Sequence, residues 1–200
     1  MVREMNLLQD TRETQILDAA EIVLERFGAR RMTMEDVAEV VGLSRPAVYQ
    51  YFPSKSALVV AALHRFHTRI LDRVRTVIAS GPDIQSRIKR AIREHDGVLF
   101  DHVSGKTQDP WFLTPSDAET TTILNDTAAE FRNIIRNELL KSVHAEAQAR
   151  FLADLLVAFS DGVRRNAQDR TEFDRQINVG VNRLLPQSLR PSTHPEPHET

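Results

Sequence analysis

Apolar side chains recur at helical spacing along most of this chain. In the segment 11–28, Ile16, Ala20, Val23 and Phe27 fall at i, i+4, i+7 and i+11, the stripe that an amphipathic helix turns toward a core. Glycine is scarce, with seven residues, and runs of alternating polar and apolar residues are few. The pattern predicts an all-α protein with a loop over 102–115 and helices over 11–28, 34–41, 45–51, 55–79, 83–101, 116–142, 145–167 and 171–185.

The segment 33–55, TMEDVAEVVGLSRPAVYQYFPSK, is the most informative part of the chain. Thr33 is a good N-cap, and Asp36 three residues later can complete a capping box. Gly42 follows the helical pattern directly and can end a helix in the left-handed conformation. Ser44 can then cap a second short helix. The segment therefore predicts two short helices joined by a tight turn.

The apolar positions of these two helices divide each of them into an inner and an outer face. Val37, Val40 and Val41 are expected to form the buried stripe of the first helix, and Val48 and Phe52 share one face of the second. The opposite face of the second helix carries Arg45, Pro46, Ala47, Tyr49 and Gln50. Such a pair is typical of a helix-turn-helix, whose second helix enters the DNA major groove. An ordinary antiparallel helical pair whose exposed face binds nothing is the alternative.

The residues 11–63 resemble the DNA-binding domain of the TetR (tetracycline repressor) family of transcriptional regulators. TRETQILDAAEIVLERFG, residues 11–28, is similar to the first helix of that domain, and residues 32–63 carry its second conserved frame. The matching positions of this frame are Thr33, Val37, Ala38, Gly42, Ser44, Tyr49, Tyr51, Phe52, Lys55 and Leu58. Two positions depart from it, since Val41 stands where alanine is usual and Leu43 where valine is usual.

The side chains of the second helix predict how DNA would be bound. Gln50 can exchange hydrogen bonds with a base edge, adenine by preference, and Arg45 can reach guanine or a phosphate. Pro46 and Ala47 offer apolar contact to a thymine methyl group. Contacts with phosphates, which set register but not sequence, are expected from Thr33, Tyr49, Tyr51 and Lys55.

Net charge does not add to this picture. Lys and Arg number 26 and Asp and Glu 28, and residues 1–60 hold seven basic and nine acidic side chains. A DNA-binding domain usually carries a basic footprint. Any footprint here must be local, from Arg30, Arg31, Arg45 and Lys55. We therefore expect modest non-specific affinity and a dimer that binds two half-sites together.

The chain divides into four predicted segments. A flexible arm over 1–10 precedes the DNA-binding domain over 11–63, and a regulatory and dimerisation domain follows over 64–185, with the boundary inside the helix 55–79. Residues 186–200 hold four prolines and almost no hydrophobic residues, and are expected to form a disordered tail. No apolar run is long enough to span a membrane, and the start of the chain is too polar for a secretory signal, so a cytoplasmic protein is expected.

The resemblance implies a helical-bundle regulatory domain that binds a small-molecule effector and dimerises through its last two long helices. Candidate pocket residues are the aromatic, aliphatic and histidine side chains Phe66, His67, Ile70, His95, Phe100, His102, Trp111, Phe112 and Phe131. Ordinary core packing is the alternative for each of them. Candidate interface residues are Phe151, Leu152, Leu155, Leu156, Phe159, Val163, Ile177, Val181 and Leu184, with Gly180 permitting close approach. This apolar stripe can also belong to the core of one subunit.

Enzyme, cofactor and metal motifs are absent from the sequence. There is no P-loop, no G-x-S-x-G and no H-E-x-x-H, and without cysteine there is no thiolate ligand or disulfide. We therefore expect no catalytic residue, no cofactor and no metal site. The sequence favours a homodimeric transcription regulator, a repressor released from a palindromic operator by an unidentified small-molecule effector. The alternative is a helical ligand-binding or scaffold protein without DNA contact.

Overall fold

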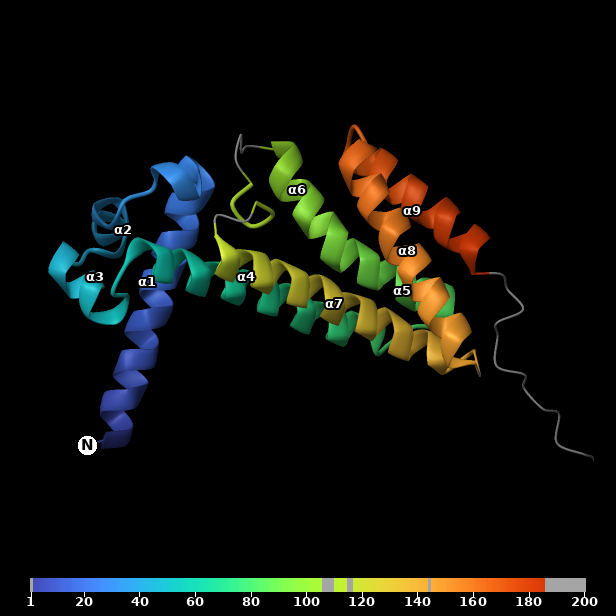
Figure 1. Cartoon of the computed structure of the whole chain (residues 1–200), viewed down its shortest axis with the longest axis horizontal. Coiled ribbons are helices and arrows are strands. Elements are labelled where there is room, and N and C mark those ends of the chain that lie inside the picture. Colours follow the sequence, from blue (N-terminus) through green and yellow to red (C-terminus); the bar gives the residue numbers. More distant parts are fainter. Residues whose placement is uncertain (1, 106–109, 115–116, 144, 186–200) are drawn as a thin grey trace, which may run out of the picture. The chain divides into compact units, whose positions relative to one another are not determined.

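The computed structural model describes residues 2–105, 110–114, 117–143 and 145–185, and every element in these ranges is helical (Figure 1). The predicted tail over 186–200 lies outside the described residues. The elements are α1 (Val2–Arg31), α2 (Met34–Val41), α3 (Arg45–Tyr51), α4 (Lys55–Ile78), α5 (Ile84–Ile92), the π-helical turn η1 (Arg93–Gly97), α6 (Val98–Gly105), α7 (Ala118–Leu140), α8 (Glu146–Asn166) and α9 (Arg170–Leu184). Among the described helices, none is long and apolar enough to cross a membrane.

The chain folds into two compact units. The first unit comprises residues 1–70 and 101–128, and the second comprises 71–100 and 129–200. The change of unit at residues 70 and 71 falls inside α4, later than the predicted boundary at 63 and 64. The return of 101–128 to the first unit is not foreseen by the continuous regulatory domain predicted over 64–185. Parts of α6 and α7 thus belong to the same unit as the helix-turn-helix.

The first unit is built on α1, against which α2 packs, and α2 in turn contacts α3. The buried stripe of α1 consists of Ile16, Ala19, Ala20, Val23 and Leu24. Where the sequence predicts an arm over 1–10, the structure continues α1 back to Val2, a segment that contains no Gly or Pro to end a helix. The start predicted at residue 11 is therefore wrong.

Two apolar residues of the first unit are misplaced by the sequence prediction. Phe27 is 37% exposed, because Gly28 takes the next buried position and breaks the helix there with φ 72° and ψ 165°. The guanidinium of Arg26 lies 5.9 Å from the centre of the Phe27 ring. Val40 is 43% exposed, because the buried stripe of α2 starts at Met34 and continues through Val37 and Ala38.

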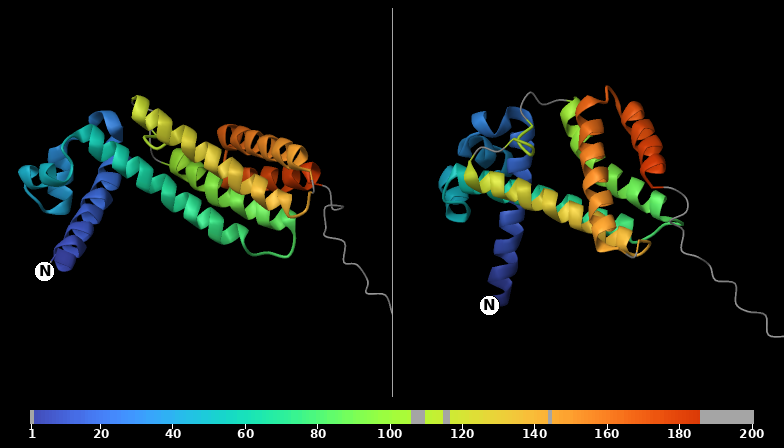
Figure 2. Two further views of the ribbon diagram at one scale, coloured as in Figure 1. Left: turned by 60° about the horizontal axis from the view of Figure 1, so that its bottom comes forward. Right: turned by 45° about the vertical axis from the view of Figure 1, so that its right-hand side comes forward.

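The second unit contains the antiparallel pair α8 and α9, which lie side by side in every view (Figure 2). Both helices also contact η1, and α9 contacts α5. The sequence predicts one regular helix over 83–101, whereas the structure inserts a π turn at 93–97 and continues α6 to Gly105, into the predicted loop. The extra residue of a π turn shifts the helical phase. As a result three consecutive residues, His95, Asp96 and Gly97, are buried.

Candidate nucleic-acid interface

The start of α2 is fixed by a reciprocal capping box. The Thr33 hydroxyl oxygen accepts a hydrogen bond from the backbone N–H of Asp36 at 3.1 Å, and the Asp36 carboxylate accepts one from the backbone N–H of Thr33 at 2.8 Å. The Thr33 hydroxyl also donates to the same carboxylate at 2.6 Å. Two of the N–H groups that a helix start leaves open are satisfied in this way. The Thr33 hydroxyl is therefore occupied within the free protein.

The turn between α2 and α3 depends on one left-handed residue. Gly42 has φ 72° and ψ 33° and directs its N–H to the last carbonyls of α2. Leu43 follows with a backbone hydrogen bond of 2.9 Å to the carbonyl of Ala38. Ser44 then caps α3 by accepting from the backbone N–H of Ala47 at 3.3 Å. The two helices are therefore joined by a tight turn of three residues, as the sequence predicts.

Helix α3 packs against the first unit with one face and exposes the other face to solvent. Val48 and Phe52 are buried in the first unit, as predicted. Of the six predicted DNA-binding residues on α3, four are exposed, Arg45, Pro46, Tyr49 and Gln50, and two are half-buried, Ala47 and Tyr51. The structure thus brings the residues predicted for base contacts together on the outer side of one helix.

Arg45 and Tyr49 form a pair on that outer side. The guanidinium carbon of Arg45 lies 5.5 Å from the centre of the Tyr49 ring, and one guanidinium nitrogen donates to the Tyr49 hydroxyl at 3.5 Å. This hydrogen bond is the largest influence that raises the pKa of Arg45 above its ordinary value. The pair holds a permanent positive charge beside an aromatic ring, one turn along α3.

Lys55 has a partner that the sequence does not reveal. Its Nζ donates to the backbone carbonyl of Arg30 at 2.9 Å, which joins the start of α4 to the end of α1. Ser54 caps α4 by accepting from the N–H of Ala57 at 3.0 Å. An ammonium group has three donors, so the contact with Arg30 leaves Lys55 further capacity for a phosphate.

The predicted effector residues fall into two groups, one in each unit. In the first unit Phe66 lies at the centre of an aromatic cluster, with its ring centre 5.1 Å from that of Phe112 and 5.6 Å from that of Trp111. The Nε2 atom of His67 lies 2.8 Å from the carbonyl oxygen of Phe112. His102 contacts the Phe66 ring, and its Nε2 lies 3.6 Å from a carboxylate oxygen of Glu25. Ile70 is buried in the same unit.

The second unit holds the other three predicted effector residues. The rings of His95 and Phe131 are stacked, with centres 3.8 Å apart, and Phe100 stacks on Phe173 at 5.3 Å. His95 Nδ1 lies 3.0 Å from a carboxylate oxygen of Asp96. Arg164, which the sequence analysis does not single out, lies beside them, with its Nε 3.8 Å from the same oxygen.

In this cluster of His95, Asp96 and Arg164, three buried polar atoms have no hydrogen-bond partner among the residues that the structure describes, namely His95 Nε2, Asp96 Oδ2 and Arg164 Nε. Buried polar groups are normally paired, so each such atom needs an explanation. The sequence offers a signal for Arg164, because it lies eight residues after Leu156, a residue of the predicted apolar face, and helical spacing places i, i+4 and i+8 on one side.

The predicted interface residues separate into an inner and an outer set. Leu156, Val163, Ile177 and Val181 are buried within the unit itself, so the core reading holds for them. Leu152, Phe159 and Leu184 are half-buried. Phe151 and Leu155 remain 65% and 37% exposed, and Val179, which was not predicted, is 52% exposed. A Cβ atom on Gly180 would lie 2.0 Å from the Phe159 ring, so Gly180 admits a side chain of its own subunit.

A capped helix-turn-helix at the front of an otherwise helical chain defines the class of helix-turn-helix proteins. Residues 16–62 match the family model of the bacterial regulatory proteins, tetR family. This match covers the helix-turn-helix and supports the resemblance of residues 11–63 to that family.

Two relatives agree with the assignment. The HTH-type transcriptional activator FasR of Mycolicibacterium smegmatis is 30% identical over 106 residues, which are 53% of this chain and 47% of FasR. The HTH-type transcriptional repressor KstR2 of Rhodococcus jostii is 28% identical over 81 residues, 40% of each chain. The chain therefore matches less than half the length of either relative.

The fold is similar to that of solved structures over most of the chain. The transcriptional regulator FadR of Bacillus subtilis, solved in complex with stearoyl-CoA, superimposes with a TM-score of 0.65 and covers 86% of this chain and 97% of FadR at 18% identity. This likeness extends beyond the helix-turn-helix and supports the predicted all-α architecture with a helical C-terminal part.

Proposed function

We propose that this chain is a homodimeric DNA-binding transcription regulator of the cytoplasm, a repressor that leaves a palindromic operator when a small-molecule effector binds. The observation that carries the proposal is the outer side of α3, where Arg45, Tyr49 and Gln50 are exposed. Val48 and Phe52 hold the other side in the core. A short helix fixed in this way can enter a major groove with its polar side chains leading.

Each side chain on the outer face of α3 has a proposed role. The Gln50 amide reads a base edge, adenine by preference, and Arg45 reads guanine or binds a phosphate. Pro46 and Ala47 lie against a thymine methyl group. Tyr49, Tyr51 and Lys55 bind phosphates and set the register of the helix.

Thr33 is the least favourable of the proposed phosphate contacts. Its hydroxyl already accepts from and donates to Asp36, so a phosphate must replace a hydrogen bond of 2.6 Å that holds the capping box. The backbone N–H groups of the first turn of α2 are the better donors, because they point out of the start of a helix.

We infer the dimer from the apolar residues that one subunit leaves uncovered on α8 and α9. Phe151, Leu155 and Val179 are exposed, whereas Leu156 and Val181 on the same helices are buried in the unit. Phe151 and Leu155 lie at i, i+4 on one face of α8, and an exposed apolar patch on a monomer marks an interaction surface. A two-fold dimer presents two copies of α3 and is suited to a palindrome with half-sites in successive major grooves.

The effector site that we propose lies in the second unit, at His95, Phe100 and Phe131 with Asp96 and Arg164. This cluster combines aromatic faces with unpartnered polar atoms. Its charges are already paired, since Arg164 contacts both Asp96 and Asp161. A neutral ligand group that both donates and accepts hydrogen bonds fits this charge balance better than a carboxylate, because a second buried anion beside Asp96 would be repelled.

Selection of bound sequences from random DNA duplexes by the purified chain tests the proposal. A recovered palindrome supports base reading by a dimer. A reporter gene placed behind that palindrome gives the sign of regulation. If the chain represses, expression of the reporter rises when the gene for the chain is deleted. The alternative, a helical ligand-binding or scaffold protein without DNA contact, is favoured by the exposed carboxylates Glu35 and Glu39 on α2. Recovery of no preferred sequence at ordinary ionic strength would establish that alternative.

A further inference from the structure

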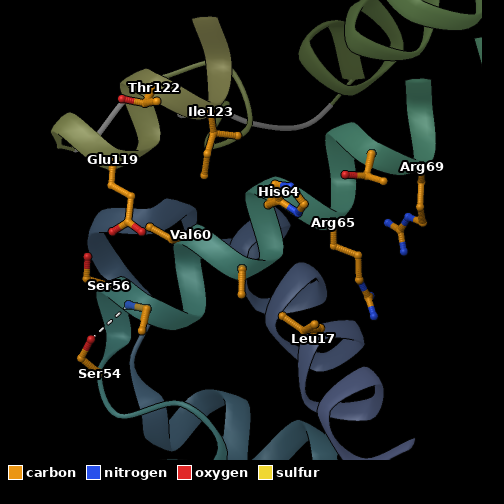
Figure 3. Close-up of a pocket in the computed structure, with 13 residues that line it drawn as sticks. Leu17, Ser54, Ser56, Val60, His64, Arg65, Arg69, Glu119, Thr122 and Ile123 are labelled. Carbon is orange, nitrogen blue, oxygen red and sulfur yellow. Dashed lines mark hydrogen bonds between the residues drawn. The ribbon is translucent and has the colours of Figure 1, made fainter. Parts of the chain in front are cut away.

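An open groove of about 910 Å³ lies within the first unit, between α1, the start of α4 and the start of α7 (Figure 3). Thirteen residues line it, none of which belongs to the outer face of α3 or to the predicted effector residues: Leu17, Ser54, Ser56, Ala57, Val60, Ala61, His64, Arg65, Thr68, Arg69, Glu119, Thr122 and Ile123. The volume is in the range of small-molecule sites. The groove is therefore a second candidate site, separate from both surfaces described above.

The floor of the groove is apolar. Ala57, Val60 and Ala61 share one face of α4, and Leu17 from α1 and Ile123 from α7 border it. All five side chains are half-buried. Two of the three α4 residues are alanines, which leave room above the helix for a flat or chain-like apolar body.

The cationic end of the groove is neutralised from within the protein. Arg65 contacts the carboxylates of both Asp18 and Glu21 on α1, with its Nε 3.0 Å from Glu21, and Arg69 contacts Glu21 as well. Arg65 also donates to the backbone carbonyl of Thr14 at 3.1 Å. These two arginines are balanced by two carboxylates, so this end has no excess charge with which to attract an anion.

The opposite end carries a carboxylate that no cation of the described residues balances. Glu119 extends from α7 toward Val60 and the start of α4 (Figure 3). Among the described residues it makes no hydrogen bond or ion pair. Lys55, the cation at the start of α4, directs its Nζ to the carbonyl of Arg30. The hydroxyl of Ser56 donates to Asp117 at 3.3 Å, a second carboxylate at this end. Glu119 lies in the first turn of α7, where the helix dipole stabilises the negative charge of its carboxylate. The carboxylate nevertheless stays available to a cationic ligand.

We propose that this groove binds an amphipathic organic cation, an amine or quaternary ammonium group attached to an aryl or alkyl body. The cationic group lies at Glu119 and the apolar body lies on Ala57, Val60 and Ala61. Because one side of the groove is open to water, the ion pair is a partly exposed one and contributes selectivity more than affinity. The proposal is independent of DNA binding and of the effector site in the second unit.

Three probes of similar size and different charge test the proposal on the full chain: phenylbutylamine, phenylbutanol and phenylbutyrate. Binding is followed by the methyl resonances of Leu17, Val60 and Ile123, which border the groove. The amine is expected to shift these resonances at the lowest concentration, followed by the alcohol and then the acid. Equal binding of the three probes, or shifts confined to other methyl groups, would overturn the proposal.

Charge and shape variants sharpen the result. Glu119→Gln is expected to weaken the amine about fivefold, equivalent to ~1 kcal/mol, and to leave the alcohol unchanged. Asp126→Asn removes a carboxylate that is exposed on the same helix but outside the groove, and is expected to leave both unchanged. Ala61→Trp fills the floor and is expected to abolish binding of all three. A preference for the amine that survives in the Glu119→Gln variant would show that the groove does not recognise a cation.

Discussion

The Nζ of Lys55 donates to the backbone carbonyl of Arg30 at 2.9 Å, across 25 residues of sequence. The contact closes the first unit around the helix-turn-helix, because Arg30 lies at the end of α1 and Lys55 at the start of α4. Lys55 therefore positions the elements that flank α2 and α3. The same ammonium group retains donors for a phosphate.

Replacement of Lys55 by Ala is expected to have two separable effects. Loss of the hydrogen bond with Arg30 should lower the free energy of unfolding by about 1 kcal/mol, measured by urea denaturation. Loss of a phosphate contact should reduce the slope of log K against log salt concentration by about 0.9 for each subunit. Arg175→Ala, which removes an exposed arginine of the second unit, is the control for net charge. An unchanged slope would restrict Lys55 to its positioning role.

Replacement of Gln50 by Ala is expected to relax sequence preference at one base position of each half-site. The loss there should be about 1–3 kcal/mol, because one bidentate contact with a base edge is removed. Competition binding with operators that differ at single positions measures it. Equal weakening on all operator variants would show that Gln50 does not read a base.

Replacement of Tyr49 separates its ring from its hydroxyl. Tyr49→Phe keeps the ring under the Arg45 guanidinium, whereas Tyr49→Ala removes both contacts. If the stacked ring holds Arg45 in place for DNA, the alanine variant should bind DNA more weakly than the phenylalanine variant. Equal affinities of the two variants for DNA would show that the ring does not contribute, and the only role left for Tyr49 would be a hydrogen bond from its hydroxyl to a phosphate.

Two glycines should resist replacement for different physical reasons. At Gly42 a Cβ atom would meet nothing within 4 Å, so the penalty comes from the left-handed backbone, about 1–2 kcal/mol for Ala and less for Asn. At Gly180 a Cβ atom would collide with the Phe159 ring, so Gly180→Ala should cost about 1–3 kcal/mol through displaced packing. Thermal unfolding measures both. The second loss, but not the first, should be partly recovered in a Phe159→Leu background.

Replacement of Phe151 by Asp should dissociate the proposed dimer without unfolding the subunit, because the side chain is 65% exposed in the single chain. Sedimentation velocity gives the oligomeric state, and circular dichroism confirms that the helices remain. Asn125→Asp adds the same charge at an exposed position of the first unit and serves as the control. A variant that stays dimeric would place the interface elsewhere.

Sequence reasoning was most successful where structure is set locally. Thr33 with Asp36, Gly42 and Ser44 are a cap, a left-handed turn and a second cap, and each depends on neighbours within a few residues. The exposed side of α3 followed from the two buried positions Val48 and Phe52. These features were predicted correctly because their physical causes lie within the segment itself.

The remaining differences arise from long-range packing. Periodicity could not show that Gly28 interrupts α1 and leaves Phe27 outside, nor that an inserted residue at η1 buries His95 and Asp96 together. It also could not show that Trp111 and Phe112, from the middle of the chain, pack against Phe66 in the unit of the helix-turn-helix. Such contacts depend on residues more than forty positions apart, about which local spacing carries no information.

The packing of Trp111 and Phe112 against Phe66 limits how this protein can be dissected or recombined. A fragment that ends at residue 70, or a chimaera that grafts residues 1–70 onto the sensor of another regulator, would separate Phe66 from these two aromatic side chains. Apolar surface that is buried in the whole chain would then be exposed to solvent, and the helix-turn-helix would lose part of the core of its own unit. Engineers who wish to transplant its DNA specificity should carry the segment 101–128 along with it.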